Sequence, residues 1–308
     1  MENVNIQFTR FSAFYSPLIA TVSGGFLEEE GLVGNLSVAE HGVSALQALL
    51  RSEVDLVQSA PSQAFASAQK GEIPSALHFA QINNTDGFFL VGRTPEPDFA
   101  ISKLKGLRVL VDHGGQPLLM FNYACHKAGL QLEDFEAIDA GSADEMVAAF
   151  KRGEGDYVHL QGPAPQQLEA EGSGVVVGQL GDWVGRCAFS SLASRFDWLE
   201  SDTALGFMRA FRRARQWVNE TSVAEIAASE IAYFPDVSVK VLAETISAYQ
   251  ALGCWSGQVE ITPEQIAVSV DVFRLGGLIT GDIDPALVAV SPPGYSRCKF
   301  WLHLIVST

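Results

Sequence analysis

The sequence predicts an α/β protein built as a clamshell of two similar lobes, with two crossings of the chain between them. The main observation is an internal repeat, in which residues 45–57 correspond to residues 146–158 at an offset of 101 positions. In addition, each copy opens an apolar helical stretch with Pro-Leu, at Pro17 and Pro117, and closes it with Gly-Leu, at Gly31 and Gly129. Two long copies predict two lobes, because solenoids need several short stacked units.

Strands and helices are expected to alternate along the first lobe. A serine at position 16 followed by Pro17 is typical of a helix start, and the apolar residues of segment 43–51 follow a helical period. The expected strands are 5–9, 36–39, 56–57 and 76–82, and the expected helices begin at Ser16 or span 43–51 and 61–70.

Two apolar runs are predicted to carry the crossings between the lobes. The run Phe88–Val91 lies between glycines and precedes a proline-spaced segment, 93–97, and Cys187–Leu192 is expected to return and pair with it. Lobe one would then comprise residues 1–91 and 187–290, and lobe two residues 92–186. The tail 291–308 stays unassigned. Within lobe two the expected strands are 108–111, 136–139, 157–158 and 175–177.

The last third of the chain is expected to be helical and to pack on lobe one. Its predicted helices span 203–219, 222–231, 238–251 and 262–275, the last with a capped start at Thr262. The first carries four arginines, which are typical of the solvated face of a long amphipathic helix: Arg209, Arg212, Arg213 and Arg215.

Composition excludes several classes of function. The 308 residues are 47% hydrophobic and 18% charged, enough for a substantial core, and the formal net charge of −16 opposes binding to nucleic acid or an anionic membrane. The four cysteines are widely spaced without a metal-binding pattern, and no cofactor is expected. The first residues lack a signal-peptide pattern, so we expect a periplasmic or extracytoplasmic protein if a leader was removed, and a cytoplasmic one if Met1 is the native start.

A ligand site is predicted beyond the carboxyl ends of the strands, where helix starts point their N–H groups outward. Two loops from each lobe meet this rule: 10–16, 59–62, 113–117 and 161–163. The first supplies aromatic faces and hydroxyls, and the third resembles a small anion nest, although a ligand-free turn would use the same glycines. The candidate ligand contacts are Phe11, Ser12, Tyr15, Ser59, Ser62, Asn83, Asn84, His113, Gly114, Gly115, Gln116, Gln161, Gly162 and Arg186.

Two of these candidates come from the expected hinge. Asn83 and Asn84 precede the first crossing, where they could equally form a turn. Arg186 precedes the second crossing and is the basic residue expected to meet an anionic group, unless it is an idle surface arginine. No catalytic residue is predicted, since no nucleophile motif is present and the histidines stand apart.

Three segments together resemble the periplasmic solute-binding proteins of the nitrate, sulfonate, taurine and thiamine-precursor type: the loop from Phe11 to Pro17, the segment 26–32 and the segment 49–55. In this family a glycine is usual where Ser52 stands. The resemblance implies a type II periplasmic-binding-protein-like clamshell that closes by hinge motion on a sulfonate, carboxylate or pyrimidine-like ligand, works as a monomer and delivers its ligand to an ABC permease.

Enzymes on the same fold are the alternative. They include pyrimidine synthases of thiamine biosynthesis and aromatic sulfinate desulfinases, which act on small aromatic or heteroaromatic substrates. Both use cysteine motifs that this chain lacks, since Phe14 and Tyr15 stand where a desulfinase has its cysteine. The resemblance therefore implies binding rather than catalysis.

Overall fold

The computed structural model describes residues 1–40 and 43–294, which form ten strands and twelve α-helices within those ranges. The strands are β1 (Glu2–Phe8), β2 (Leu32–Val38), β3 (Leu56–Ser59), β4 (Leu77–Thr85), β5 (Phe88–Gly92), β6 (Arg108–Leu110), β7 (Glu136–Ile138), β8 (Tyr157–Gln161), β9 (Val175–Gln179) and β10 (Arg186–Ser194). The helices are α1 (Ser16–Ser23), α2 (Ala45–Leu50), α3 (Phe65–Ala68), α4 (Gln116–Lys127), α5 (Ala143–Lys151), α6 (Ala164–Ala170), α7 (Leu180–Val184), α8 (Phe196–Leu199), α9 (Asp202–Glu220), α10 (Val223–Glu230), α11 (Val239–Leu252) and α12 (Pro263–Leu275).

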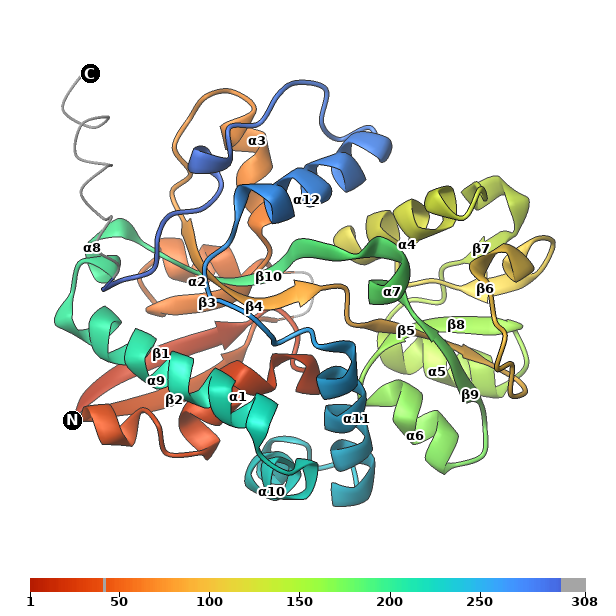
Figure 1. The fold of residues 1–308 in the computed structure, drawn as a ribbon, viewed down its shortest axis with the longest axis horizontal. Coiled ribbons are helices and arrows are strands. Elements are labelled where there is room, and N and C mark those ends of the chain that lie inside the picture. The colour runs from red at the N-terminus through yellow and green to blue at the C-terminus, as the bar shows by residue number, and fades with distance from the viewer. Residues whose placement is uncertain (41–42, 295–308) are drawn as a thin grey trace.

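The strands form two sheets of five with the same topology, and helices lie around each of them (Figure 1). The first sheet has the order β2-β1-β3-β10-β4 and the second the order β7-β6-β8-β5-β9. In both, the first three strands are parallel and the fourth runs antiparallel to its neighbours. The predicted two-lobed α/β fold is confirmed.

The predicted pairing of the two crossing strands is wrong. β10 pairs with β3 and β4, whereas β5 pairs with β8 and β9 and therefore belongs wholly to the second sheet. Both edges of β5 are thus occupied, and the long, buried β4 offers β10 the free edge. The chain first passes between the sheets at Asp86-Gly87, not after Val91, and passes back at Gly185-Arg186. We use "lobe one" for residues 1–86 and 186–294 and "lobe two" for 87–185; their status as separate domains stays a proposal.

The internal repeat is visible in matching hydrogen bonds. Asp55 Oδ2 accepts the backbone N–H of Asn5 on β1 at 2.7 Å, and Asp156 Oδ2 accepts that of Arg108 on β6 at 2.9 Å. Each aspartate thereby ties the start of a central strand to its neighbour. The turn before it has a left-handed residue in both copies, Ser52 with a φ of 59° and Gly153 with a φ of 85°.

Helix boundaries follow the expected signals with three exceptions. Ser16 opens α1 but does not cap it, since the N-cap residue is Tyr15 and makes no side-chain cap hydrogen bond. Thr262 and Gln265 form a capping box at the start of α12, and α4 ends before Gly129, as expected. However, α1 ends at Ser23, and a separate 3₁₀ turn leads to Gly31. Segment 61–70 is likewise a 3₁₀ turn followed by the short α3.

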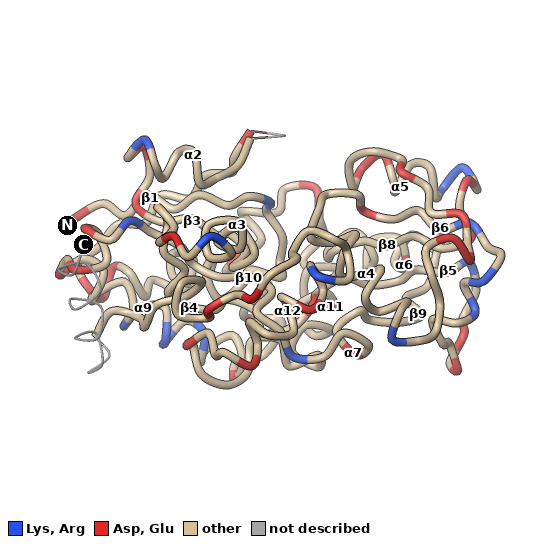
Figure 2. Tube along the Cα trace, turned by 90° about the horizontal axis from the view of Figure 1, so that it is seen from above, with Lys and Arg blue, Asp and Glu red and all other residues tan. Residues whose placement is uncertain are grey.

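The C-terminal helices α9 and α10 pack against α1, and α12 packs against β10, all in lobe one as expected. In addition, α11 contacts α6 and α12 contacts α4, which belong to lobe two. The expectation that the arginines of α9 form a solvated face is wrong for Arg215. Its side chain is buried and donates hydrogen bonds to the carbonyl oxygens of Gln81 at 3.1 Å and Ser256 at 3.1 Å. Arg213, in contrast, pairs with Glu30 at the surface side of α9. Charged residues are spread along the chain in both lobes (Figure 2).

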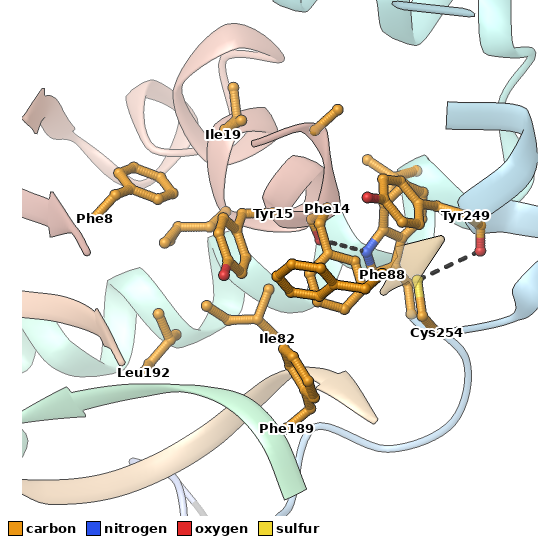
Figure 3. Packing of buried hydrophobic residues seen from close by; sticks show 14 of the residues in the cluster. Phe8, Phe14, Tyr15, Ile19, Ile82, Phe88, Phe189, Leu192, Tyr249 and Cys254 are labelled. Carbon is orange, nitrogen blue, oxygen red and sulfur yellow. Dashed lines mark hydrogen bonds between the residues drawn. The ribbon is translucent and has the colours of Figure 1, made fainter. Parts of the chain in front are cut away.

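An aromatic cluster fills the seam between the lobes (Figure 3). Phe14 contacts the rings of Phe189 and Tyr249, and Trp255 Nε1 donates to the Phe14 carbonyl at 2.9 Å. The hydroxyl of Tyr249 donates to the carbonyl of Gly87 at 3.1 Å, at the first passage between the sheets. Burial of each large ring contributes about 1.5–3 kcal/mol, so this cluster stabilises the packing between the lobes.

Candidate ligand-binding site

A cavity of about 350 Å³ lies between the two lobes at the carboxyl ends of β1, β3 and β8. This is the position predicted from the strand-end rule. Hydroxyl, amide and aromatic side chains dominate its walls. The described lining residues are Thr9, Arg10, Tyr15, Ser44, Gln58, Ser59, Ala60, Ser62, Gln63, Phe88, Gly114, Gly115, Gln116, Pro117, Leu119, Gln161, Phe189, Ser190, Phe273 and Leu278.

Four aromatic residues give the cavity apolar surfaces: Tyr15, Phe88, Phe189 and Phe273. The first three belong to the seam cluster (Figure 3). Burial raises the pKa of Tyr15, an effect opposed by Arg10 and by hydrogen bonds with Gln161 and Ser190. Tyr15 is therefore a neutral hydroxyl at physiological pH. Rings beside neutral donors and acceptors suit a small molecule with a planar or apolar part.

The charged groups at the cavity form one pair between the lobes. Arg10 Nη1 lies 2.7 Å from Asp112 Oδ2, and the exposed fractions of the two side chains are 39% and 6%. The other carboxylate oxygen, Asp112 Oδ1, accepts the N–H of Gly114 at 2.8 Å. Burial acts to raise the pKa of Asp112, but Arg10 and this N–H outweigh it and hold the pKa below its usual range.

Gln116, at the start of α4, bridges the lobes at the cavity wall. Its Oε1 accepts the hydroxyl of Ser62 at 2.6 Å, and its Nε2 donates to the carbonyl of Phe189 at 2.9 Å. Both partners belong to lobe one. Gln116 therefore joins the start of α4 to two separate segments of lobe one.

Gln58 holds the lobe-one wall in place. Its Oε1 accepts the N–H of Thr9 at 3.1 Å, and its Nε2 donates to the Ser190 hydroxyl at 2.9 Å. These bonds join the ends of β1, β3 and β10 and so position the lobe-one wall.

The structure brings half of the candidate ligand contacts to the cavity: Tyr15, Ser59, Ser62, Gly114, Gly115, Gln116 and Gln161. Their role in binding stays a prediction. Phe11 does not line the cavity and packs against Phe8 and Phe234. Ser12 is turned away too, since its hydroxyl donates to the Gly162 carbonyl at 2.6 Å.

The hinge candidates Asn83, Asn84 and Arg186, and also His113, lie outside the described lining. Arg186 donates to Asn84 Oδ1 and to the carbonyl of Gly253 at 2.8 Å, and so is engaged outside the cavity. Asn83 is buried with no hydrogen-bond partner for either side-chain atom. His113 Nδ1 lies 2.8 Å from the carbonyl of Val111.

Several lining residues were missed, for different reasons. Thr9 ends a predicted strand, Arg10 opens the first predicted loop and Gln58 directly follows a predicted strand, so the strand-end rule contained the signal for them. Phe189 and Ser190 lie on β10, whose partners were mispredicted. Phe273 and Leu278 come from α12 and the residues after it, and no motif indicated them: only packing of the C-terminal helices brings them here.

Behind the cavity wall lies a set of buried polar groups with unpartnered atoms. Burial lowers the pKa of His159 to about 3, so this ring is neutral, and both of its nitrogens lack a partner. Burial raises the pKa of Asp86 to about 7, although the N–H of Phe88 opposes this by donating to its carboxylate at 2.7 Å.

Two α/β lobes, joined by two passages and enclosing a ligand-sized cavity at facing strand ends, define the periplasmic-binding-protein fold. The model of the NMT1-like family matches residues 2–232. The chain belongs to this family.

Known proteins with a similar sequence or a similar fold match most of the chain. The candidate binding protein YtlA of Bacillus subtilis is 30% identical over 256 residues, or 81% of this chain and 76% of that protein. The alkanesulfonate-binding protein SsuA of Xanthomonas axonopodis, bound to MOPS, has a TM-score of 0.69 with 18% identity, over 94% of this chain and 99% of that one. The nitrate-binding protein NrtA of Synechocystis has a TM-score of 0.61 with 13% identity, over 96% and 92%.

Among the described helices, none is long and apolar enough to cross a membrane.

Proposed function

We propose that this protein is a solute-binding protein that captures a small organic molecule between its lobes and delivers it to an ABC permease. The observation that carries the proposal is the cavity itself, which is built from the strand ends of both lobes. At about 350 Å³ it is in the size range of pockets for small molecules, roughly 300–1,000 Å³.

The relatives support binding as the general role. YtlA is named as a candidate binding protein, SsuA as alkanesulfonate-binding and NrtA as nitrate-binding. By analogy with the periplasmic proteins among them, we propose that the chain acts outside the cytoplasmic membrane. Delivery to a permease is the part of the proposal that rests on this analogy alone.

The thiols of the described residues do not favour catalysis. Cys125, Cys187 and Cys254 are buried, and burial raises the pKa of each. A nucleophilic cysteine needs a lowered pKa and access to substrate. None of the three lines the described wall of the cavity.

Closure of the lobes on the ligand is the proposed mechanism. Both wall segments that Gln116 bridges belong to lobe one, while Gln116 itself moves with lobe two. A ligand seated against both lobes adds contacts that exist only in the closed state, and so it shifts the population toward closure.

A thermal-shift screen tests the proposal. Alkylsulfonates, aromatic carboxylates and pyrimidines are compared on the wild type and on Ala60→Trp, whose indole would fill the cavity at a lining position. Ala66→Trp, at an exposed position outside the described lining, is the matched control. We expect one class to raise the melting temperature of the wild type and the control but not of Ala60→Trp, because binding to the folded state stabilises it. Equal shifts in all three proteins, or a compound recovered chemically altered, would contradict the proposal.

A further inference from the structure

Arg10 determines whether the cavity favours a charged ligand. It is the single cationic side chain among the described lining residues, and those residues include no acidic side chain. Arg186, the cation expected from the sequence to meet an anion, is bound to Asn84 and Gly253 instead. Any preference for an anionic ligand would therefore depend on Arg10 alone.

The carboxylate of Asp112 already forms a salt bridge with Arg10. Asp112 Oδ2 lies 2.7 Å from Arg10 Nη1, and Asp112 Oδ1 takes the N–H of Gly114 at 2.8 Å. The N–H of Gly115 is also engaged, with the His113 carbonyl at 2.8 Å. The glycine turn that resembles an anion nest thus holds an internal anion. An anionic ligand that took Nη1 would have to displace Asp112 and leave a 6% exposed carboxylate without its cation, which is costly. An anion at the other N–H groups of Arg10 would meet a guanidinium whose charge Asp112 already offsets.

The surroundings do not restore a positive charge. His159 supplies no charge, because its buried ring, packed between Phe88 and Phe121, is neutral. Asp86, which also interacts with Asp112, adds no cation. The Arg10–Asp112 pair therefore has a net charge near zero where it faces the cavity.

We propose that Asp112 sets the charge preference of the cleft: by neutralising Arg10 it selects a ligand that is uncharged where it meets this guanidinium. The inference rests on the proposed solute-binding function and narrows its ligand class. Arg10 still serves as a hydrogen-bond donor, since Asp112 engages Nη1 and the Arg10 guanidinium carbon lies 5.7 Å from the centre of the Phe88 ring. The favoured ligand is an uncharged, planar molecule that presents an acceptor atom to Arg10 beside this ring.

Three probes of one shape and different charge test the proposal: benzoate, benzamide and benzamidine, measured at pH 7 by ligand-observed NMR, which detects weak binding. In the wild type, benzamide is expected to bind better than either ion. Asp112→Asn keeps an acceptor for the Gly114 N–H but frees the charge of Arg10. We expect it to raise the affinity for benzoate relative to benzamide by roughly tenfold, as for a charge-assisted hydrogen bond in a shielded site.

Arg10→Gln is the mirror variant and is expected to shift the preference toward benzamidine, because it leaves Asp112 unpaired. The double variant Arg10→Gln/Asp112→Asn removes both charges and should return to the wild-type preference for benzamide. Circular dichroism of each variant checks that it is folded.

The proposal is overturned if the wild type prefers benzoate, or if folded Asp112→Asn gains no benzoate binding, whether or not the other probes bind. If Ala60→Trp abolishes binding of the probes but Asp112→Asn shows no change in charge preference, only this inference is rejected. If Ala60→Trp binds the probes as well as the wild type does, the solute-binding function itself is rejected. The two failures are therefore distinguishable.

Discussion

The two lobes share one framework but place different groups at equivalent strand ends. The strand register pairs β1 with β3 in lobe one and β6 with β8 in lobe two. When these pairs are compared, Thr9 corresponds to Asp112, and Gln58 corresponds to His159. Gln58 lines the cavity and makes hydrogen bonds with both of its side-chain ends, whereas His159 is buried between aromatic rings with both nitrogens unpartnered. The repeat fixes where ligand-facing positions occur, and the individual side chains decide what each position does.

The two passages between the lobes differ in the same way. Asp86 and Gly87 at the first passage are enclosed by the aromatic cluster, while Gly185 and Arg186 at the second are more accessible. A methyl group at Gly87 would lie 2.2 Å from the Phe14 ring. Gly185 has open space around it but a φ of 86°. The first passage is restricted by packing and the second by backbone conformation.

The largest expected effect concerns the buried carboxyl of the first passage. Burial raises the folded-state pKa of Asp86 from 3.8 to about 7, so the folded protein holds a proton that the unfolded chain releases. Its contribution to stability is fully present below about pH 4 and is lost as the pH rises toward about 7. Asp86→Asn removes this loss. The free energy of unfolding of the variant, relative to the wild type, should therefore rise by roughly 2–4 kcal/mol as the pH increases from 4 to 8.

The measurement is urea denaturation at a series of pH values. Asp182→Asn, an exposed carboxyl before the second passage, is the matched control and should show a flat difference. A flat difference for Asp86→Asn as well would show that the two passages do not differ in this respect.

Alanine at the two passage glycines should separate packing from backbone strain. We expect both Gly87→Ala and Gly185→Ala to destabilise by about 1–3 kcal/mol. Only the first should be relieved by Phe14→Leu, because a smaller side chain makes room for the new methyl group. Double-mutant cycles from thermal denaturation measure this coupling. Equal coupling of Phe14→Leu to both glycines would remove the distinction.

The matching aspartates of the repeat should be nearly interchangeable in their effect. Asp55→Ala and Asp156→Ala each leave a strand N–H, that of Asn5 or Arg108, without its acceptor. Each should cost about 1–2 kcal/mol of unfolding free energy in chemical denaturation. Asp236→Ala, at an exposed position, should change it little. If only one of the two variants is destabilised, the two aspartates have the same geometry but do not contribute equally to stability.

The smallest effect is expected at the turn before these aspartates. Ser52 has a φ of 59°, a conformation that glycine adopts more easily, and Gly153 occupies the same place in lobe two. Ser52→Gly should therefore stabilise by about 0.5–1 kcal/mol, and Gly153→Ser should destabilise by a similar amount. Differential scanning calorimetry of both variants checks the opposite signs, and shifts of the same sign would contradict this explanation.

Much of the fold was predictable because local signals and the repeat agree. The helix start at Ser16, the turn at Gly153 and the capped start at Thr262 each have a local chemical cause. The partners of β5 and β10 were not predictable in this way, since two apolar runs of similar length carry no information about which edge each will fill. The short α1 is a different case, because it ends at Gly24 and the left-handed Gly25, a local signal that the prediction passed over in favour of Gly31.

The site was predictable where it follows the strand ends and not where it depends on pairs. Tyr15, Ser59 and Gln116 lie in the predicted loops and line the cavity. Arg10 lies in the first loop too, but its neutralisation by Asp112 joins positions 102 residues apart in different lobes. No local pattern reveals such a pair. The glycine turn that was expected to bind an external anion instead binds the carboxylate of Asp112.

Native mass spectrometry of freshly purified protein, after incubation with a metabolite extract, tests the central claim most directly. The account predicts that the wild type and Ala66→Trp retain the same intact small molecule and that Ala60→Trp retains none. Retention by Ala60→Trp, or a bound species that differs chemically from the compound supplied, would contradict the account of a solute held unchanged between the two lobes.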